Sequence, residues 1–208
     1  YGINYHTLKM KEMNKFLLKV LMSLACFSAF NCIAVAASEF DIADIFNSDG
    51  TPKEGSINGV KFISAKENGL LTLALFDSES IPNKSGDNYW FLSCNSYKDN
   101  YNMNAVICGA QRGEFKILLG SLGYIIEMEN KPRGGGRYIV AFDKEPSFEA
   151  TYRIVDKVEV KKFLAKMIDS KKMQYSYKNE KNKYISNERK IQNTGLTISL
   201  LKDMRDYY

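Results

Sequence analysis

Two glutamates on one predicted strand are the first residues whose types and spacing could do chemistry. Glu127 and Glu129 stand two positions apart in a segment where apolar residues alternate, so both carboxylates fall on one strand face. Carboxylates about 5–9 Å apart can act together in glycoside hydrolysis, and this spacing meets that distance. The pair also fits an ordinary exposed face. A cell-wall hydrolase that uses Glu127 or Glu129 is therefore the alternative hypothesis.

Two other catalytic patterns lack their partners. Ser199-Leu200-Leu201-Lys202 matches Ser-x-x-Lys, in which a lysine one turn after a serine serves as its base, but no Lys-Thr-Gly follows elsewhere. The one histidine, His6, precedes the predicted mature chain. Residues 38–208 therefore hold no Ser-His-Asp or Cys-His arrangement and no histidine ligand for zinc. The sequence predicts a protein that is not an enzyme and uses no cofactor or metal.

A glycine-rich segment, Lys131-Pro132-Arg133-Gly134-Gly135-Gly136-Arg137, offers backbone amides and two arginines to a phosphate or carboxylate. It lacks the Lys-Ser/Thr pair of a P-loop and no helix is predicted after it, so it does not indicate nucleotide binding. The other interpretation is a hairpin loop whose glycines need positive φ. Arg133 and Arg137 remain candidate binding residues.

Lysines and tyrosines are interleaved near the C-terminus, between residues 171 and 184. Such interleaving is typical of sites that bind polyanions. In an exported protein the polyanions at hand are lipopolysaccharide, teichoic acid or anionic lipid, and we expect no nucleic acid partner. The other interpretation is a solvated strand whose lysines guard a sheet edge while the tyrosines enter the core. The candidate binding residues are Lys171, Lys172, Lys181 and Lys183, with Lys178, Tyr175, Tyr177 and Tyr184 among them.

The N-terminal segment indicates export. Residues 13–37 read as a signal peptide: a basic start at Met13, an apolar stretch from Val20 to Val35, and the small residues that signal peptidase requires at Ala34 and Ala36. Alternatives are a retained anchor, for which the apolar run is short, and lipidation at Cys26. We interpret residues 1–12 as an upstream extension. The expected location is periplasmic or secreted, with no membrane span after cleavage.

Two cysteines remain in residues 38–208, Cys94 and Cys108. An even count in an exported chain favours a disulfide, and closing a loop of about 15 residues is worth roughly 3 kcal/mol. The alternative, two thiols binding a metal, lacks further ligands. Trp90, close to Cys94, could stack on a sugar or lie in the core.

Charge is unevenly spread along the chain. The first 37 residues hold four of the 29 basic and one of the 24 acidic residues, so residues 38–208 carry +2 and not +5. Within that part, residues 38–156 are net −5 and residues 157–208 are net +7. This asymmetry indicates a basic surface towards the C-terminus, or two segments that neutralise each other on folding.

The elements that must position these residues follow from periodicity. Residues 38–64 are expected to be the least regular part, with a short helix at 40–46. Asp156 is expected to cap a helix at 157–168, and a second helix is expected at 196–206. Strands are predicted at 70–76, 89–94, 105–108, 115–119, 124–128, 138–143, 148–155, 171–178 and 183–192. This order favours a single α+β domain at 38–208, with an antiparallel sheet of about seven or eight strands covered by two helices.

The pattern resembles a group of envelope proteins over residues 89–204. A strand opening with Tyr89-Trp90 is followed by the two cysteines, by Arg137 to Asp143, and by a closing Gly195-Leu196 helix. This arrangement is similar to the small periplasmic proteins of the invasion-associated locus B type and to periplasmic accessory proteins of type VI secretion. The chain departs from them in lacking a second disulfide and in having Leu196 where an aromatic residue is expected.

The resemblance implies a non-enzymatic envelope protein that acts by contact, and it carries no catalytic residues over. The leading hypothesis is thus an exported protein that binds another envelope protein or an anionic envelope polymer. An inhibitor or immunity protein that plugs a partner's active site is a further alternative.

Overall fold

The computed structural model describes residues 41–77, 88–98, 104–128 and 132–208, which belong to one compact unit of residues 37–208. The predicted extension at 1–12 and the predicted signal peptide at 13–37 lie outside the described residues. The predicted fold class is confirmed: an antiparallel sheet of eight strands, two helices and one disulfide. A second sheet, of four strands, goes beyond the prediction.

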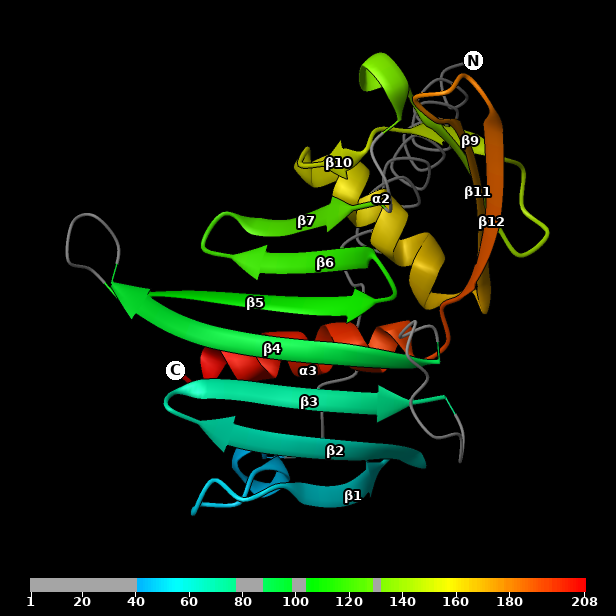
Figure 1. Cartoon of the computed structure of the whole chain (residues 1–208). Helices are drawn as coiled ribbons and strands as arrows, with labels where there is room; N and C mark the ends of the chain where they lie inside the picture. Colours follow the sequence, from blue (N-terminus) through cyan, green and yellow to red (C-terminus); the bar gives the residue numbers. More distant parts are fainter. Residues whose placement is uncertain (1–40, 78–87, 99–103, 129–131) are drawn as a thin grey trace, which may run out of the picture. The chain divides into compact units, whose positions relative to one another are not determined.

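The larger sheet is a meander in which spatial order follows chain order for seven strands (Figure 1). Each strand pairs antiparallel with the next, and a short eighth strand joins the far edge. Connections of two to five residues explain most of this order, because they leave neighbouring strands no other partner nearby, while residues 77–88 form a longer connection between β3 and β4. The strands are β1 (Lys53–Ile57), β2 (Val60–Glu67), β3 (Leu70–Phe76), β4 (Tyr89–Lys98), β5 (Asn104–Arg112), β6 (Phe115–Gly120), β7 (Gly123–Glu127) and β10 (Arg153–Ile154).

Two Asn-Gly turns form the start of this meander. Asn58 and Gly59 have φ of 50° and 78°, and Asn68 and Gly69 have φ of 47° and 79°. Positive φ at both central residues is what a two-residue hairpin turn of the right twist requires, and Asn-Gly adopts it readily. The expectation that residues 38–64 are the least regular part is wrong for the described residues 41–64, because β1 and the start of β2 lie there. The short helix expected at 40–46 is present as the 3-10 helix η1 (Ile42–Ile45).

One face of the larger sheet is buried and the other is open. Alternating apolar residues of the strands point to helix α3 (Thr194–Asp206), which packs on β4, β5 and β6. On this side Trp90, Leu92 and Cys94 are fully buried. Antiparallel sheets commonly bury one face in this way. The open face carries five exposed large apolar side chains: Ile63, Leu70, Phe91, Tyr97 and Ile107.

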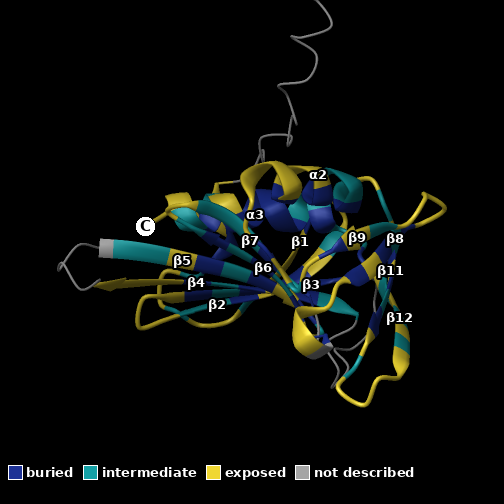
Figure 2. Cartoon of the chain, turned by 90° about the horizontal axis from the view of Figure 1, so that it is seen from above, coloured by how far each residue is buried: buried dark blue, intermediate teal, exposed yellow. Residues whose placement is uncertain are grey.

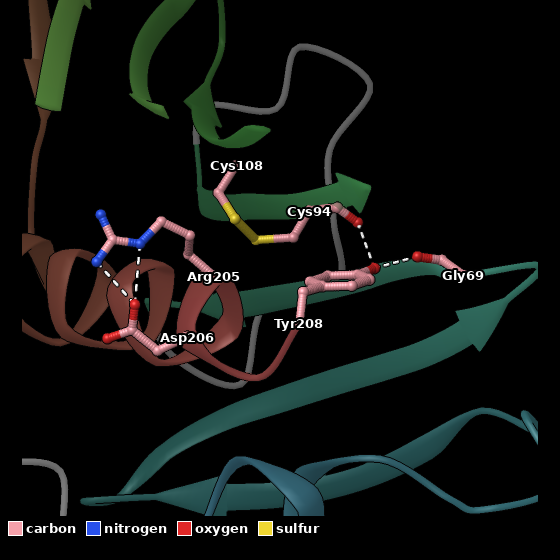
Figure 3. The surroundings of a disulfide bond; sticks show 6 residues. All are labelled: Gly69, Cys94, Cys108, Arg205, Asp206 and Tyr208. Atoms are coloured by element: carbon pink, nitrogen blue, oxygen red, sulfur yellow. Dashed lines mark hydrogen bonds and ion pairs between the residues drawn. A yellow bond between two sulfur atoms is a disulfide. The ribbon is translucent and has the colours of Figure 1, made fainter. Parts of the chain in front are cut away.

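The disulfide joins directly opposed residues of β4 and β5. Cys94 and Cys108 are register partners with Cα atoms 4.0 Å apart, and both are buried beneath the C-terminus. There the Tyr208 hydroxyl donates to the carbonyl oxygens of Gly69 and Cys94 (Figure 3). Desolvation at this place raises the pKa of the Tyr208 phenol. The predicted disulfide is confirmed, and the end of the chain is fixed over it.

The smaller sheet lies beside helix α2 (Lys157–Ile168) (Figures 1 and 2). Asp156 caps this helix as predicted, accepting from the amides of Val158 and Glu159. Phe163 of the helix contacts Phe115 of β6 and also Phe142 of the smaller sheet. The helix therefore connects the cores of the two sheets. In spatial order the smaller sheet is β12 (Tyr184–Lys190), β11 (Lys172–Lys178), β8 (Tyr138–Phe142) and β9 (Phe148–Ala150).

Two expectations about the connections are wrong. The strand predicted at 148–155 is interrupted at residues 151–152, so that β9 belongs to the smaller sheet and β10 to the larger. The glycine-rich segment does not close a hairpin, because β7 and β8 belong to different sheets and do not pair. It contains the 3-10 turn η2 (Arg133–Gly135), in which Gly134 and Gly135 do have the expected positive φ, of 61° and 74°. The segment thus carries the chain from one sheet to the other.

Candidate functional site

A groove of about 370 Å³ lies on the outer face of the smaller sheet. Its walls come from the glycine-rich segment on one side and the turn between β11 and β12 on the other. Two of the candidate regions predicted from the sequence therefore meet at one place. The lining side chains include Arg137, Ile139, Glu149, Ser176, Lys178 and Tyr184.

Strand alternation and register place the groove residues. On β8, Tyr138, Val140 and Phe142 point to the core, so that Ile139 between them faces outward and is 47% exposed. Ile139 is the register partner of both Glu149 on β9 and Ser176 on β11.

The start of β12 supplies the aromatic part of the groove. Tyr184 is opposite Lys178 across the β11–β12 pair and is 71% exposed. The Lys178 Nζ atom lies 5.0 Å from the centre of the Tyr184 ring, a cation–π distance. Tyr175 and Tyr177, by contrast, are buried; Tyr177 contributes to the groove lining, but of the three tyrosines only Tyr184 has an open ring.

The turn between β11 and β12 is held by one asparagine. The Oδ1 atom of Asn179 accepts from the amides of Lys181 and Lys183, each at 3.0 Å. Asn182 takes up φ 59°, a left-handed conformation that asparagine tolerates, and it lines the groove. Lys181 and Lys183 flank it in sequence and are exposed. The turn therefore contributes Asn182 to the groove lining and carries one exposed lysine on either side of it.

Arg137 is paired within the groove. Its guanidinium donates to the carboxylate of Glu149 at 3.0 Å, and both side chains are 64% exposed. An ion pair this open is weak and exchanges readily with another partner. The predicted binding role of Arg137 is compatible with this position. The side chain of Arg133, the other predicted arginine, lies outside the described residues.

Lys171 and Lys172 lie at the other end of the hairpin. Lys172 and Lys178 bound β11, which puts them about 20 Å apart at the usual rise of a strand. Lys172 forms an ion pair with Glu188 at 2.8 Å. The hydrogen bond with Glu188 raises the pKa of Lys172, and the hydrogen bond from Lys172 lowers the pKa of Glu188. The structure thus brings Arg137 to the groove beside the turn that carries Lys181 and Lys183, and places Lys171 and Lys172 at the far end of the hairpin.

The residues considered for catalysis take other positions. Glu127 forms an ion pair with Arg153 at 3.2 Å, and Glu129 lies outside the described residues. Ser199 is buried in α3 while Lys202 is exposed. Among the described residues, no group of three or more histidine, cysteine, aspartate or glutamate side chains could hold a metal ion.

A buried charged cluster lies apart from the groove, under the larger sheet. Arg112, 1% exposed, forms an ion pair with Asp77, with Nη1 2.9 Å from Oδ1. The guanidinium lies 5.7 Å from the centre of the Trp90 ring, and the Trp90 indole donates to the carbonyl oxygen of Gln192 at 2.8 Å. Trp90 is therefore a core residue, and its alternative as a sugar-stacking residue is wrong. The cluster fixes the loop before α3 to the centre of the sheet.

Sequence reasoning missed Ile139 and Glu149 as groove residues. The alternation of buried and exposed residues in 138–142 was available as a signal for an outward Ile139. Glu149 had no such signal, because its pairing with Arg137 depends on the register of β8 with β9.

Comparisons with known proteins identify no relative. No family model, curated protein or solved structure matches the chain. In the part of the chain that the structure describes, no helix is long and apolar enough to cross a membrane.

Proposed function

We propose that this chain is an exported, non-enzymatic protein of the cell envelope that binds an anionic envelope component by contact. The observation that carries the proposal is the groove on the smaller sheet. Arg137 and Lys178 line it, and Lys181 and Lys183 flank the lining residue Asn182 in sequence; its floor includes the exposed Ile139 and Tyr184. Clustered cations attract an anionic partner and orient it, while the apolar floor adds contact area.

Export is supported by the buried disulfide, because disulfides persist in oxidising compartments outside the cytosol. It is supported as well by the order of basic, apolar and small residues in 13–37. The hydrolase alternative gains no support from the described residues, since Glu127 is engaged by Arg153 and its predicted partner is not described. Binding without catalysis requires no pair of catalytic carboxylates, only a surface such as the groove.

Affinity capture tests the proposal. The protein, expressed from the whole sequence and purified under oxidising conditions, is held on antibody beads and exposed to a solubilised envelope fraction. Bound proteins, lipids and glycans are read by mass spectrometry. We expect an anionic component to be enriched, and the Lys181→Glu/Lys183→Glu variant to retain about tenfold less of it, since two attractions become repulsions.

The matched control is Lys161→Glu/Lys162→Glu, which makes the same change of charge at exposed positions of α2. This variant should capture as much as the unmodified protein. Equal loss in both variants would mean that only net charge matters, and no loss in either would remove the groove from the function. The intact mass of the purified protein also shows whether the signal peptide has been cleaved.

A further inference from the structure

The groove combines an exposed aromatic side chain with both hydrogen-bond donors and hydrogen-bond acceptors. Tyr184 is the most exposed aromatic residue of the smaller sheet, while its backbone is paired with β11 and the Lys178 ammonium lies 5.0 Å from the centre of its ring. A tyrosine offers a flat amphipathic surface at little cost in conformational entropy. Ile139 extends the apolar floor.

The polar lining contains an acceptor as well as donors. Arg137 and Lys178 only donate hydrogen bonds, the Glu149 carboxylate only accepts them, and the hydroxyl of Ser176 does both. A bare phosphate chain would use the donors and would be repelled by Glu149. A ligand with hydroxyl groups can donate to Glu149 while it accepts from Arg137. The lining therefore selects for hydroxyls next to a negative charge.

We infer that the groove binds a negatively charged saccharide unit of an envelope glycan. This inference rests on the proposed function and names its ligand class. A sugar ring presents an apolar C–H face to the Tyr184 ring, hydroxyls to the Arg137–Glu149 pair, and its carboxylate or phosphate to Lys178. The volume of about 370 Å³ is near the lower end of ligand pockets, which span roughly 300–1,000 Å³, and suits one or two rings.

The geometry favours a saccharide over a protein partner. The groove is open to solvent over a sheet face, with Tyr184 as its one exposed aromatic residue and Arg137, Glu149, Ser176 and Lys178 as polar lining residues. Protein hot spots are instead well-packed pockets that exclude water around an anchor residue. Stacking of one ring on one tyrosine needs no such enclosure.

NMR titration of the isotope-labelled protein with three probes tests the inference. Trigalacturonate has rings and carboxylates, maltotriose has rings without charge, and tripolyphosphate has charge without rings. We expect trigalacturonate to bind at least tenfold more tightly than either of the others, with shift changes in Ile139, Ser176 and Tyr184. Tyr184→Ala should weaken that binding about tenfold or more, as loss of a stacked ring does for nucleobases. Tyr184→Phe, which keeps the ring, should bind within about threefold of the unmodified protein.

The outcomes separate the two proposals. If tripolyphosphate binds as tightly as trigalacturonate and Tyr184→Ala changes neither, the saccharide inference is overturned while an anion-binding function stands. If no probe binds but envelope capture still depends on Lys181 and Lys183, the ligand is not a saccharide of this class and the inference is again overturned. If capture is indifferent to the two lysines, the proposed function fails and the inference fails with it. Lys162→Ala on α2 controls for general effects of charge.

Discussion

The two sheets use their charged residues in opposite ways. Under the larger sheet, Arg112 and Asp77 are paired away from water, next to Trp90. On the smaller sheet, the Arg137–Glu149 and Lys172–Glu188 pairs lie open to solvent. A buried pair is committed to the fold because neither partner can leave without exposing an unpaired charge. An exposed pair leaves both partners available to a ligand.

The open faces of the sheets differ as well. The larger sheet exposes apolar residues such as Phe91 and Ile107, which offer area without polar groups to orient a ligand. The groove of the smaller sheet offers a smaller apolar floor together with donors and an acceptor. Exposed apolar area and chemical selectivity are thus found in different parts of this molecule.

Removing Asp77 should have the largest effect. In Asp77→Ala, the Arg112 guanidinium loses its carboxylate in the core, and breaking a buried pair in this way costs about 3–5 kcal/mol. In Glu149→Ala, the same chemical change at the surface should cost less than about 1 kcal/mol. Urea denaturation of both variants under oxidising conditions measures the difference.

If Asp77→Ala does not fold, Asp77→Asn keeps a hydrogen-bond acceptor and should still be clearly less stable than Glu149→Gln. Similar losses of unfolding free energy at positions 77 and 149 would contradict the contrast between the sheets.

Removing the disulfide should have the next largest effect, and it should be confined to stability. Cys94→Ser/Cys108→Ser opens a loop closed across 14 residues, which lowers the unfolding free energy by about 3 kcal/mol in the chain-entropy picture. Both cysteines belong to the larger sheet, so groove binding by the folded variant should stay within about twofold of the unmodified protein. Thermal unfolding and the trigalacturonate titration measure the two quantities. Loss of binding in a variant that is still folded would show that the sheets are coupled.

Much of the fold could be predicted because its signals are local. Strand 70–76, the cap at Asp156 and the apolar side of α3 each follow from a few neighbouring residues, and the structure has them as expected. The β1–β2 hairpin also had a local signal, the Asn58-Gly59 pair, although no strand was predicted there. The division into two sheets could not be predicted in this way. It depends on β8 pairing with β11 and on β10 pairing with β7, across distant parts of the chain.

The site shows the same limit. Basic residues near the groove could be found from composition, as Arg137, Lys181 and Lys183 were. The distance of these residues from Lys171 and Lys172 follows from the length of β11. The strand predicted at 171–178 already implied this distance. The partners Glu149 and Glu188 follow from register, and register is set by which face of each strand the core requires.

Removing the Lys172–Glu188 ion pair should lower the free energy of unfolding the least. The pH dependence of this loss distinguishes the ion pair from other contributions to stability. The lowered pKa of Glu188 means that its contribution to stability is present above the ordinary value of 4.5 and is lost as the pH falls through the folded-state pKa. The raised pKa of Lys172 means that its contribution is present below 10.5 and is lost as the pH rises through the folded-state value. The pair therefore acts across the middle of the pH range, and weakly, because both groups are exposed to solvent and salt.

Comparing the stability of the Glu188→Gln variant with that of the unmodified protein at several pH values tests this prediction. The urea midpoint of the unmodified protein should exceed that of the variant slightly at neutral pH. The excess should shrink in acid below pH 4.5 and in base above pH 10.5. Glu180→Gln, which changes an exposed carboxylate of the β11–β12 turn, is the matched control. An excess that persists unchanged into acid would mean that the glutamate stabilises β12 by packing and not by charge. Position 188 would then resemble the buried pair of the larger sheet more than its own surroundings, and the contrast between the sheets would have to be drawn residue by residue.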